Sequence, residues 1–311
     1  MTKTTLGLLF AFAFVLLEST QFVYFGGLFQ KMNSFQFGFL VFFLTIVIFV
    51  GWTAISNPGQ IRNALGMRRE LIAVNLGAVV TFTAYLLSVQ LIEPAIAYTV
   101  SAGTMPISAY LLYRLGIREG ENMRNKAEAI GNSLIFASIV FLALITMFGL
   151  SGFVRGDSSI AVLGVLLAIV DGVFFTLILV YSQRLNRNGV GPSAVLGLRL
   201  PMYVVVTGGL FYLGLGYQPA AELTWAQTGF YVAVGFLLLI PPLYFFQKAA
   251  SLLSALTISA LTALGPFVIF CLQLVEGRVD YSPMTLAGLS IYIVGAVLSA
   301  FGALKATTST A

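Results

Sequence analysis

The sequence of 311 residues has no histidine, one cysteine (Cys271) and few charged residues, which make up only 9% of the chain. A single cysteine excludes an internal disulfide, and the lack of histidine removes a common metal ligand and proton shuttle. An intramembrane enzyme would need a cluster of acid, base or metal-binding groups, and the sequence offers none. We therefore expect no catalytic site, no metal and no other cofactor.

Apolar residues are what the chain has in abundance. They make up 59% of it, and the mean hydropathy is +0.98, so lipid is the expected solvent for most of the protein. A helix that spans a bilayer needs about 20 mainly apolar residues. Ten such segments are predicted, over residues 5–25, 34–52, 71–92, 94–115, 129–151, 159–183, 193–216, 229–247, 252–275 and 283–304. The fold class expected is an all-α membrane protein with ten transmembrane helices.

The second half of the sequence repeats the first. Ser34 and Gly38 recur as Ser193 and Gly197, and the pairs Tyr85 and Tyr244, Pro106 and Pro266, and Gly131 and Gly288 keep the same order at offsets of 157 to 160. Because each half holds five segments, an odd number, the two halves must have opposite orientations in the membrane. We predict one transmembrane domain over 1–311, made of inverted five-helix repeats at 1–151 and 159–305.

The basic residues indicate the orientation. With the N-terminus in the cytoplasm, twelve of the sixteen Lys and Arg residues fall on the inner side. They are Lys3, Arg62, Arg68, Arg69, Arg114, Arg118, Arg124, Lys126, Arg184, Arg187, Lys248 and Lys305. This asymmetry follows the positive-inside rule and predicts that both termini are cytoplasmic. It also accounts for the net charge of +5 without a nucleic-acid partner.

The fourth and ninth segments carry a family resemblance. The fourth has Pro94, Ala97, Tyr98, Ser101 and Pro106, with Glu119 in the following loop, and the ninth has Ser254, Ala255, Ser259, Pro266 and Glu276. With Arg199 in the seventh segment and the spacing of Gly288 and Gly295 in the tenth, this pattern resembles the EamA-type repeats of the drug/metabolite transporter superfamily, and within it the YddG-like exporters of aromatic amino acids. Two departures weaken a symmetric mechanism: Glu276 follows its proline more closely than Glu119 does, and Leu40 stands where the counterpart of Arg199 would map.

Two carboxylates, Glu18 and Asp171, lie well inside predicted spans. Charged groups in a membrane are costly and usually mark a binding or coupling site. We expect Asp171 and Glu18 to bind a substrate ammonium or a proton. Alternatively, Asp171 pairs with Arg199, or each carboxyl is satisfied by neighbouring hydroxyl or backbone groups.

Helical spacing places further polar and aromatic side chains on shared faces. Together they predict a wide, weakly polar cavity with aromatic walls, which suits amphipathic solutes. Its predicted substrate-binding residues are Phe82, Tyr85, Tyr98, Ser101, Thr104, Asp171, Phe175, Tyr244, Ser259 and Thr262. For the hydroxyl residues, helix packing is the simpler interpretation. Pro106, Pro241 and Pro266 are expected inside helices, as hinges or as fixed bends.

The function that these features predict is export of amino acids and related small metabolites across a bacterial inner membrane by alternating access. The substrate class rests on the family resemblance. A carrier of phosphorylated sugars or nucleotide sugars would have the same fold but would require several cations facing the cavity. A passive channel is a further alternative. Saturable exchange between labelled and unlabelled substrate would favour a carrier over a channel. The partners expected are a small-molecule substrate and the lipid bilayer.

Overall fold

The computed structural model describes residues 3–117, 126–216, 223–253, 255–277 and 279–308, and these ranges form thirteen helices. The helices are α1 (Lys3–Leu28), α2 (Ser34–Ser56), α3 (Pro58–Gly66), α4 (Arg68–Leu91), α5 (Pro94–Arg114), α6 (Lys126–Met147), α7 (Ser158–Arg187), α8 (Pro192–Leu198), α9 (Pro201–Tyr212), α10 (Trp225–Leu252), α11 (Ala255–Thr262), α12 (Gly265–Glu276) and α13 (Pro283–Thr308). The expected all-helical membrane fold is confirmed. Within the described ranges, nine helical segments are long and apolar enough to cross a bilayer, with α8 and α9 counted as one.

Two predicted spans are interrupted. The segment expected over 193–216 forms α8 and then α9, with the break at Arg199 and Leu200, and the segment expected over 252–275 forms α11 and α12. Pro201 and Pro266 each lie in the first turn of the later helix. Proline is tolerated there because the first helical N–H groups have no partner within the helix. Pro266 therefore begins a helix and does not lie inside one as we expected, whereas Pro106 and Pro241 are internal to α5 and α10.

Other helix ends also have local causes. Asn33, Asp157 and Thr224 cap α2, α7 and α10, each accepting a hydrogen bond from a backbone N–H of the first turn. Proline stands in the first turn of α3, α5 and α8 as well. The short helix α3 was not predicted, because its mixed polar sequence gives no membrane signal.

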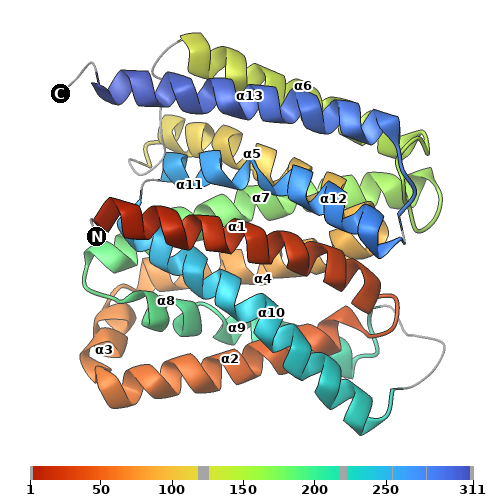
Figure 1. Cartoon of the computed structure of the whole chain (residues 1–311). Coiled ribbons are helices and arrows are strands. Elements are labelled where there is room, and N and C mark those ends of the chain that lie inside the picture. The colour runs from red at the N-terminus through yellow and green to blue at the C-terminus, as the bar shows by residue number, and fades with distance from the viewer. Residues whose placement is uncertain (1–2, 118–125, 217–222, 254, 278, 309–311) are drawn as a thin grey trace.

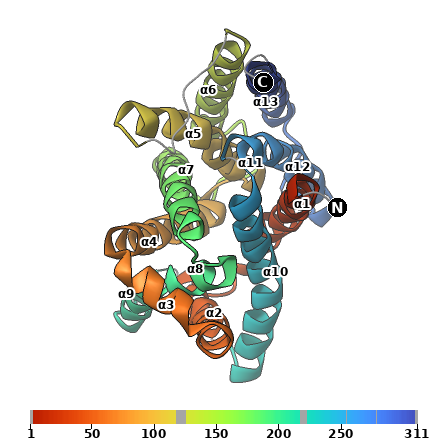
Figure 2. The same ribbon diagram turned by 90° about the vertical axis from the view of Figure 1, so that its left-hand side faces the viewer.

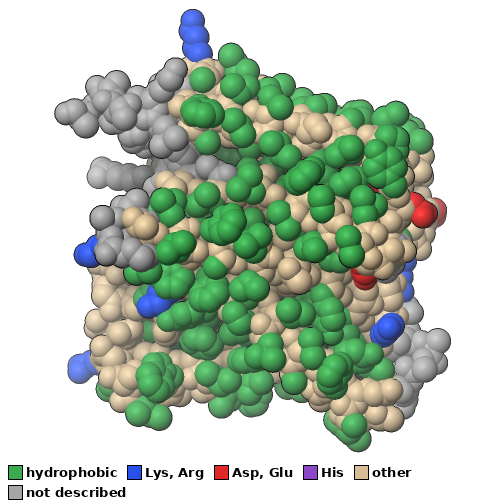
Figure 3. Space-filling view, viewed as in Figure 1, with side chains coloured by type: hydrophobic (Ala, Val, Ile, Leu, Met, Phe, Trp, Pro, Cys, Tyr) green, Lys and Arg blue, Asp and Glu red, His purple; other side chains and the backbone are tan. Residues whose placement is uncertain are grey.

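The helices form a bundle in which segments distant in sequence lie side by side (Figures 1 and 2). α1 packs against α10, α4 against α7, and α2 against both α8 and α9. α6 and α13 pair along their lengths at one edge of the bundle. Gly131 and Gly295 permit that close approach, since a Cβ at Gly295 would lie 2.8 Å from the carbonyl oxygen of Gly131. In the space-filling view, hydrophobic side chains cover the broad middle of the molecule and charged side chains lie mainly toward its two ends (Figure 3).

A buried carboxylate ties several chain segments together at the end of the bundle where α4 meets α5. Glu93 accepts hydrogen bonds from the backbone N–H of Gly152 (2.9 Å), the hydroxyl of Thr285 (3.0 Å) and the side-chain amide of Gln273. The backbone of Asp280 also donates to Gly152. Glu93 thus joins α5, α12, α13 and the loop before α7.

Candidate binding cavity

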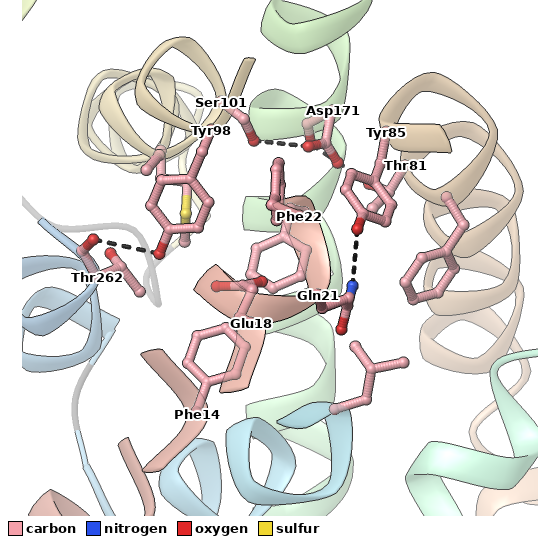
Figure 4. Close-up of a pocket in the computed structure, with 15 residues that line it drawn as sticks. Phe14, Glu18, Gln21, Phe22, Thr81, Tyr85, Tyr98, Ser101, Asp171 and Thr262 are labelled. Atoms are coloured by element: carbon pink, nitrogen blue, oxygen red, sulfur yellow. Dashed lines mark hydrogen bonds between the residues drawn. The ribbon is translucent and has the colours of Figure 1, made fainter. Parts of the chain in front are cut away.

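A small cavity of about 40 Å³ lies among α1, α4, α5, α7, α10 and α11 (Figure 4). That volume admits only a few water molecules, so a small organic ligand would require side chains of the wall to move aside. Its lining residues are Phe14, Glu18, Gln21, Phe22, Thr81, Phe82, Tyr85, Tyr98, Ser101, Ala102, Met105, Asp171, Phe175, Leu243 and Thr262. Six of these fifteen residues are aromatic, so ring faces make up much of the wall.

One face of α1 contributes four of the lining residues. Phe14, Glu18, Gln21 and Phe22 are spaced four, three and one residues apart, which places them on one side of a helix. The side-chain amide of Gln21 donates a hydrogen bond of 2.8 Å to the hydroxyl of Tyr85 on α4. α1 and α4 are therefore linked across the cavity by a polar contact.

Asp171 is held by the contact between α5 and α7. The hydroxyl of Ser101 donates to Asp171 Oδ2 at 2.7 Å, and the Asp171 side chain is buried. The next residue, Gly172, makes this approach possible. A Cβ there would collide with the carbonyl oxygen of Ser101 and would lie 2.9 Å from Thr104 Cβ.

Three aromatic rings form the centre of the wall. The ring of Phe22 lies 4.6 Å from that of Tyr85 and 4.9 Å from that of Tyr98, measured between centroids. The Tyr98 hydroxyl donates to the backbone carbonyl of Thr262 at 3.2 Å, at the end of α11. Gly265 leaves room for the Tyr98 ring, because a Cβ at that position would lie 2.5 Å from its atoms. The position of the Tyr98 side chain thus depends on the interruption between α11 and α12.

The charges that line the cavity have one sign. Glu18 and Asp171 both line it, and the fifteen lining residues include no Lys or Arg. Carboxylates attract an ammonium group, and aromatic faces accept either a cation or an apolar ring. The arrangement is therefore suited to a small molecule that combines a positive charge with apolar surface.

The structure brings most of the predicted binding residues together. Phe82, Tyr85, Tyr98, Ser101, Asp171, Phe175 and Thr262 line the cavity, together with the predicted coupling residue Glu18. Thr104 is not among the lining residues: its hydroxyl donates to Val100 of its own helix at 2.6 Å, and its Cβ lies where α7 approaches at Gly172. Tyr244 stands apart as well, with its ring centroid 5.8 Å from that of Phe49. The side chain of Ser259 lies outside the described residues.

Asp171 and Arg199 do not pair in the described part of the chain. The Asp171 carboxylate accepts its hydrogen bond from Ser101, whereas Arg199 Nη1 donates to Gln247 Oε1 at 3.2 Å. The guanidinium carbon of Arg199 lies 5.8 Å from the ring centroid of Phe82. Of the alternatives for Asp171, the structure therefore favours a hydroxyl partner over an ion pair.

The sequence interpretation did not assign Phe14, Gln21, Phe22, Thr81, Ala102, Met105 and Leu243 to the site. Gln21 gave a usable signal, since a buried amide inside an apolar helix needs a partner. Phe14 and Phe22 follow once Glu18 and Gln21 define a face of α1. Ala102, Met105 and Leu243 carry no polar signal, and only the packing of the helices places them at the cavity.

Comparison with known proteins supports the fold and gives no information on function. No protein-family model matches the sequence, and no curated protein matches it either. Among solved structures, one described only as "Crystal structure of protein" superposes with a TM-score of 0.63 over 95% of this chain and 95% of its own, at 18% identity. At that level of identity the likeness concerns the fold alone, and the chain shares that fold along nearly its whole length.

Proposed function

We propose that this chain is an exporter of amino acids and related amphipathic metabolites, with the ten-helix inverted-repeat architecture of the drug/metabolite transporter superfamily. The repeats are 1–151 and 159–305, within one domain. The observation that carries the proposal is a cavity between the two halves, lined by two carboxylates and six aromatic rings. α1, α4 and α5 supply one side of the cavity, and α7, α10 and α11 supply the other.

The helix pairing supports the repeat. If α7 is the counterpart of α1 and α10 that of α4, the contacts of α1 with α10 and of α4 with α7 are equivalent. α6 and α13 would be the fifth helices of the two halves, and they pair with each other. The count of ten requires α11 and α12 to act together as one interrupted span. Transporter sites are commonly built where such interrupted helices meet at the interface of two repeats.

An amino-acid ligand matches the cavity by its chemistry. Its ammonium would bind between Asp171 and Glu18, and an aromatic side chain would stack against Tyr85, Tyr98 or Phe22. A phosphorylated sugar fits less well, because its charge is negative and the fifteen lining residues include no cation. The same residues offer no cluster suited to catalysis, and we assign the chain no enzymatic role.

We place both termini in the cytoplasm on the distribution of Lys and Arg, and we assign the protein to a bacterial inner membrane on the family resemblance. Glu93 and its partners then lie at the outer end, where they hold α5, α12 and α13 together. Alternating access would require these contacts to part when the outer end opens. A carrier of this kind exchanges substrate across the membrane, whereas a passive channel shows no stimulation by substrate on the opposite side.

The test is uptake of a panel of radiolabelled amino acids, aromatic and aliphatic, into liposomes that contain the purified protein. We expect saturable uptake of phenylalanine that unlabelled phenylalanine inside the vesicles accelerates. Repeating the measurement with an imposed pH gradient asks whether transport is coupled to protons. Absence of uptake of every amino acid by folded protein would contradict the substrate assignment, and unsaturable uptake without exchange would favour a channel.

A further inference from the structure

Arg199 has a buried guanidinium that is only partly hydrogen-bonded. The side chain is fully buried at the break between α8 and α9. Nη1 donates to Gln247 Oε1, while Nε and Nη2 have no partner among the described residues. The amide nitrogen of Gln247 is likewise buried and without a partner there. Three donors that belong to two adjacent side chains are thus left unsatisfied.

The geometry of these donors defines the ligand that they fit. Nε and Nη2 form one edge of the planar guanidinium, with two parallel N–H groups that match the two oxygens of a carboxylate. Leaving such donors buried and unpaired is costly. If Arg199 served only to hold the break between α8 and α9, its donors would be expected to bond the backbone carbonyls freed by that break. Arg199 instead donates to a side chain of α10.

The guanidinium adjoins the cavity. The Phe82 ring lines the cavity and lies 5.8 Å from the Arg199 guanidinium carbon, so Phe82 stands between the two. On α10, Leu243 lines the cavity and Gln247 follows one helical turn later. A ligand in the cavity would approach Arg199 at Phe82, whose ring also packs against those of Phe42 and Tyr203.

We propose that the Nε–Nη2 edge of Arg199, with the Gln247 amide beside it, binds the carboxylate of the transported amino acid. This inference rests on the proposed function and deepens it: Asp171 and Glu18 attract the ammonium, and Arg199 receives the carboxylate attached to the same carbon once the Phe82 ring turns aside. The protein would thereby select zwitterions over simple amines, which the two cavity carboxylates alone would not do.

The test compares phenylalanine with phenethylamine, which lacks only the carboxylate, as competitors of labelled phenylalanine uptake in proteoliposomes. Wild-type protein should prefer phenylalanine by roughly 10- to 100-fold, the range for hydrogen bonds to a charged group. Arg199→Gln should bring that ratio close to one by weakening phenylalanine alone. Arg199→Lys should restore it only in part, because an ammonium cannot offer the paired N–H groups.

Two further variants guard against misinterpretation. Gln247→Glu places a carboxylate beside Arg199 and should also reduce the preference, in a protein that retains a buried partner for the guanidinium. Lys248→Gln is the matched control, since it removes the neighbouring cation, whose Nζ lies 5.5 Å from the Tyr244 ring centroid. The phenylalanine preference of Lys248→Gln should equal that of the wild type.

The outcomes separate this inference from the proposed function. If wild-type protein transports no amino acid, the proposed function fails and the inference fails with it. If it transports phenylalanine but Arg199→Gln weakens both competitors equally, Arg199 is structural and the inference alone is wrong. Dependence of wild-type uptake on chloride, tested by replacement with methanesulfonate and lost in Arg199→Gln, would assign the guanidinium to an inorganic anion and would overturn the inference.

Discussion

Asp171 is the residue on which the proposed site most depends. Its carboxylate accepts one hydrogen bond, from Ser101, in a wall that is mostly apolar and aromatic. Asp171→Asn keeps an acceptor for that hydroxyl but removes the charge that would attract an ammonium. We expect phenylalanine uptake by proteoliposomes to fall by about 10-fold or more, from the usual strength of a hydrogen bond to a charged group.

The control for this substitution lies on the same helix. Asp157 caps α7 by accepting hydrogen bonds from the backbone N–H groups of Ser159 and Ile160, far along the helix from the cavity. Asparagine caps helices about as well as aspartate, so Asp157→Asn should leave uptake unchanged. Equal uptake by the wild type and Asp171→Asn would remove Asp171 from the binding site.

The stability of the folded protein should depend on pH through Glu93. Burial raises the pKa of the Glu93 carboxyl, although hydrogen bonds from Gly152, Gln273 and Thr285 act in the opposite direction. The folded protein therefore holds this proton more tightly than the unfolded chain does. The contribution of Glu93 to stability is greatest below the ordinary pKa of 4.5 and declines as pH rises through the raised pKa.

Thermal unfolding in detergent across pH 4 to 8 measures this effect, with the Glu93→Gln variant as reference. The difference in melting temperature, wild type minus Glu93→Gln, should decrease as pH rises. Glu93→Ala, which leaves three donors without their acceptor, should lose about 1–3 kcal/mol of stability. A difference that increases with pH would mean that the hydrogen bonds outweigh burial.

At the scale of helices, the cavity requires α5 and α7 to lie closer than side chains usually allow. Gly172 faces the Ser101 carbonyl, so Gly172→Ala should push α7 away and break the hydrogen bond between Ser101 and Asp171. We expect a loss of stability of about 1–3 kcal/mol from overpacking, together with reduced uptake.

Gly209→Ala is the matched control for that substitution. Gly209 is exposed on α9, and a Cβ there would meet nothing within 4 Å. Because alanine favours a helix over glycine, Gly209→Ala should raise stability by roughly 0.5–1 kcal/mol. Both variants are compared with the wild type by thermal unfolding. A Gly172→Ala protein as stable and active as Gly209→Ala would show that the close approach of α5 and α7 is not required.

The sequence predicted helices where apolar runs are long, and it was less informative where they are broken. The apolar run continues on both sides of Arg199, yet the helix stops there and restarts at Pro201. Proline marks such positions without deciding between a kink and a restart: Pro106 stays inside α5, whereas Pro266 begins α12. That choice depends on whether neighbouring groups satisfy the freed backbone, which is a property of the packed bundle.

The sequence could predict those site residues that are polar and lie in apolar helices. Glu18, Ser101 and Asp171 are polar groups in apolar helices and do line the cavity. Thr104 was expected on the same face of α5 as Ser101, but its side chain packs where α7 approaches at Gly172. Tyr244 was expected on a polar face of its helix, together with Pro241, and instead packs against Phe49. Which part of a helical face meets a cavity depends on the neighbouring helix, and the sequence of one helix does not contain that information.

At the scale of the whole molecule, the orientation in the membrane follows from charge. The two ends of α7 offer a direct test, because Ser158 and Asn188 are both exposed and thirty residues apart. With Cys271 replaced by serine, a membrane-impermeant maleimide on intact cells should label Ser158→Cys and not Asn188→Cys. Labelling of Asn188→Cys alone would reverse the proposed orientation.

The most direct measurement of the central claim asks whether the substrate occupies this cavity. Ala102 is a small, buried lining residue, and the chain has no cysteine besides Cys271, which serine can replace. We predict that Ala102→Cys in that background reacts with a small cationic methanethiosulfonate, and that phenylalanine slows the reaction at concentrations that saturate uptake. A reaction rate unaffected by phenylalanine, in a protein that still transports it, would place the substrate elsewhere and contradict this account.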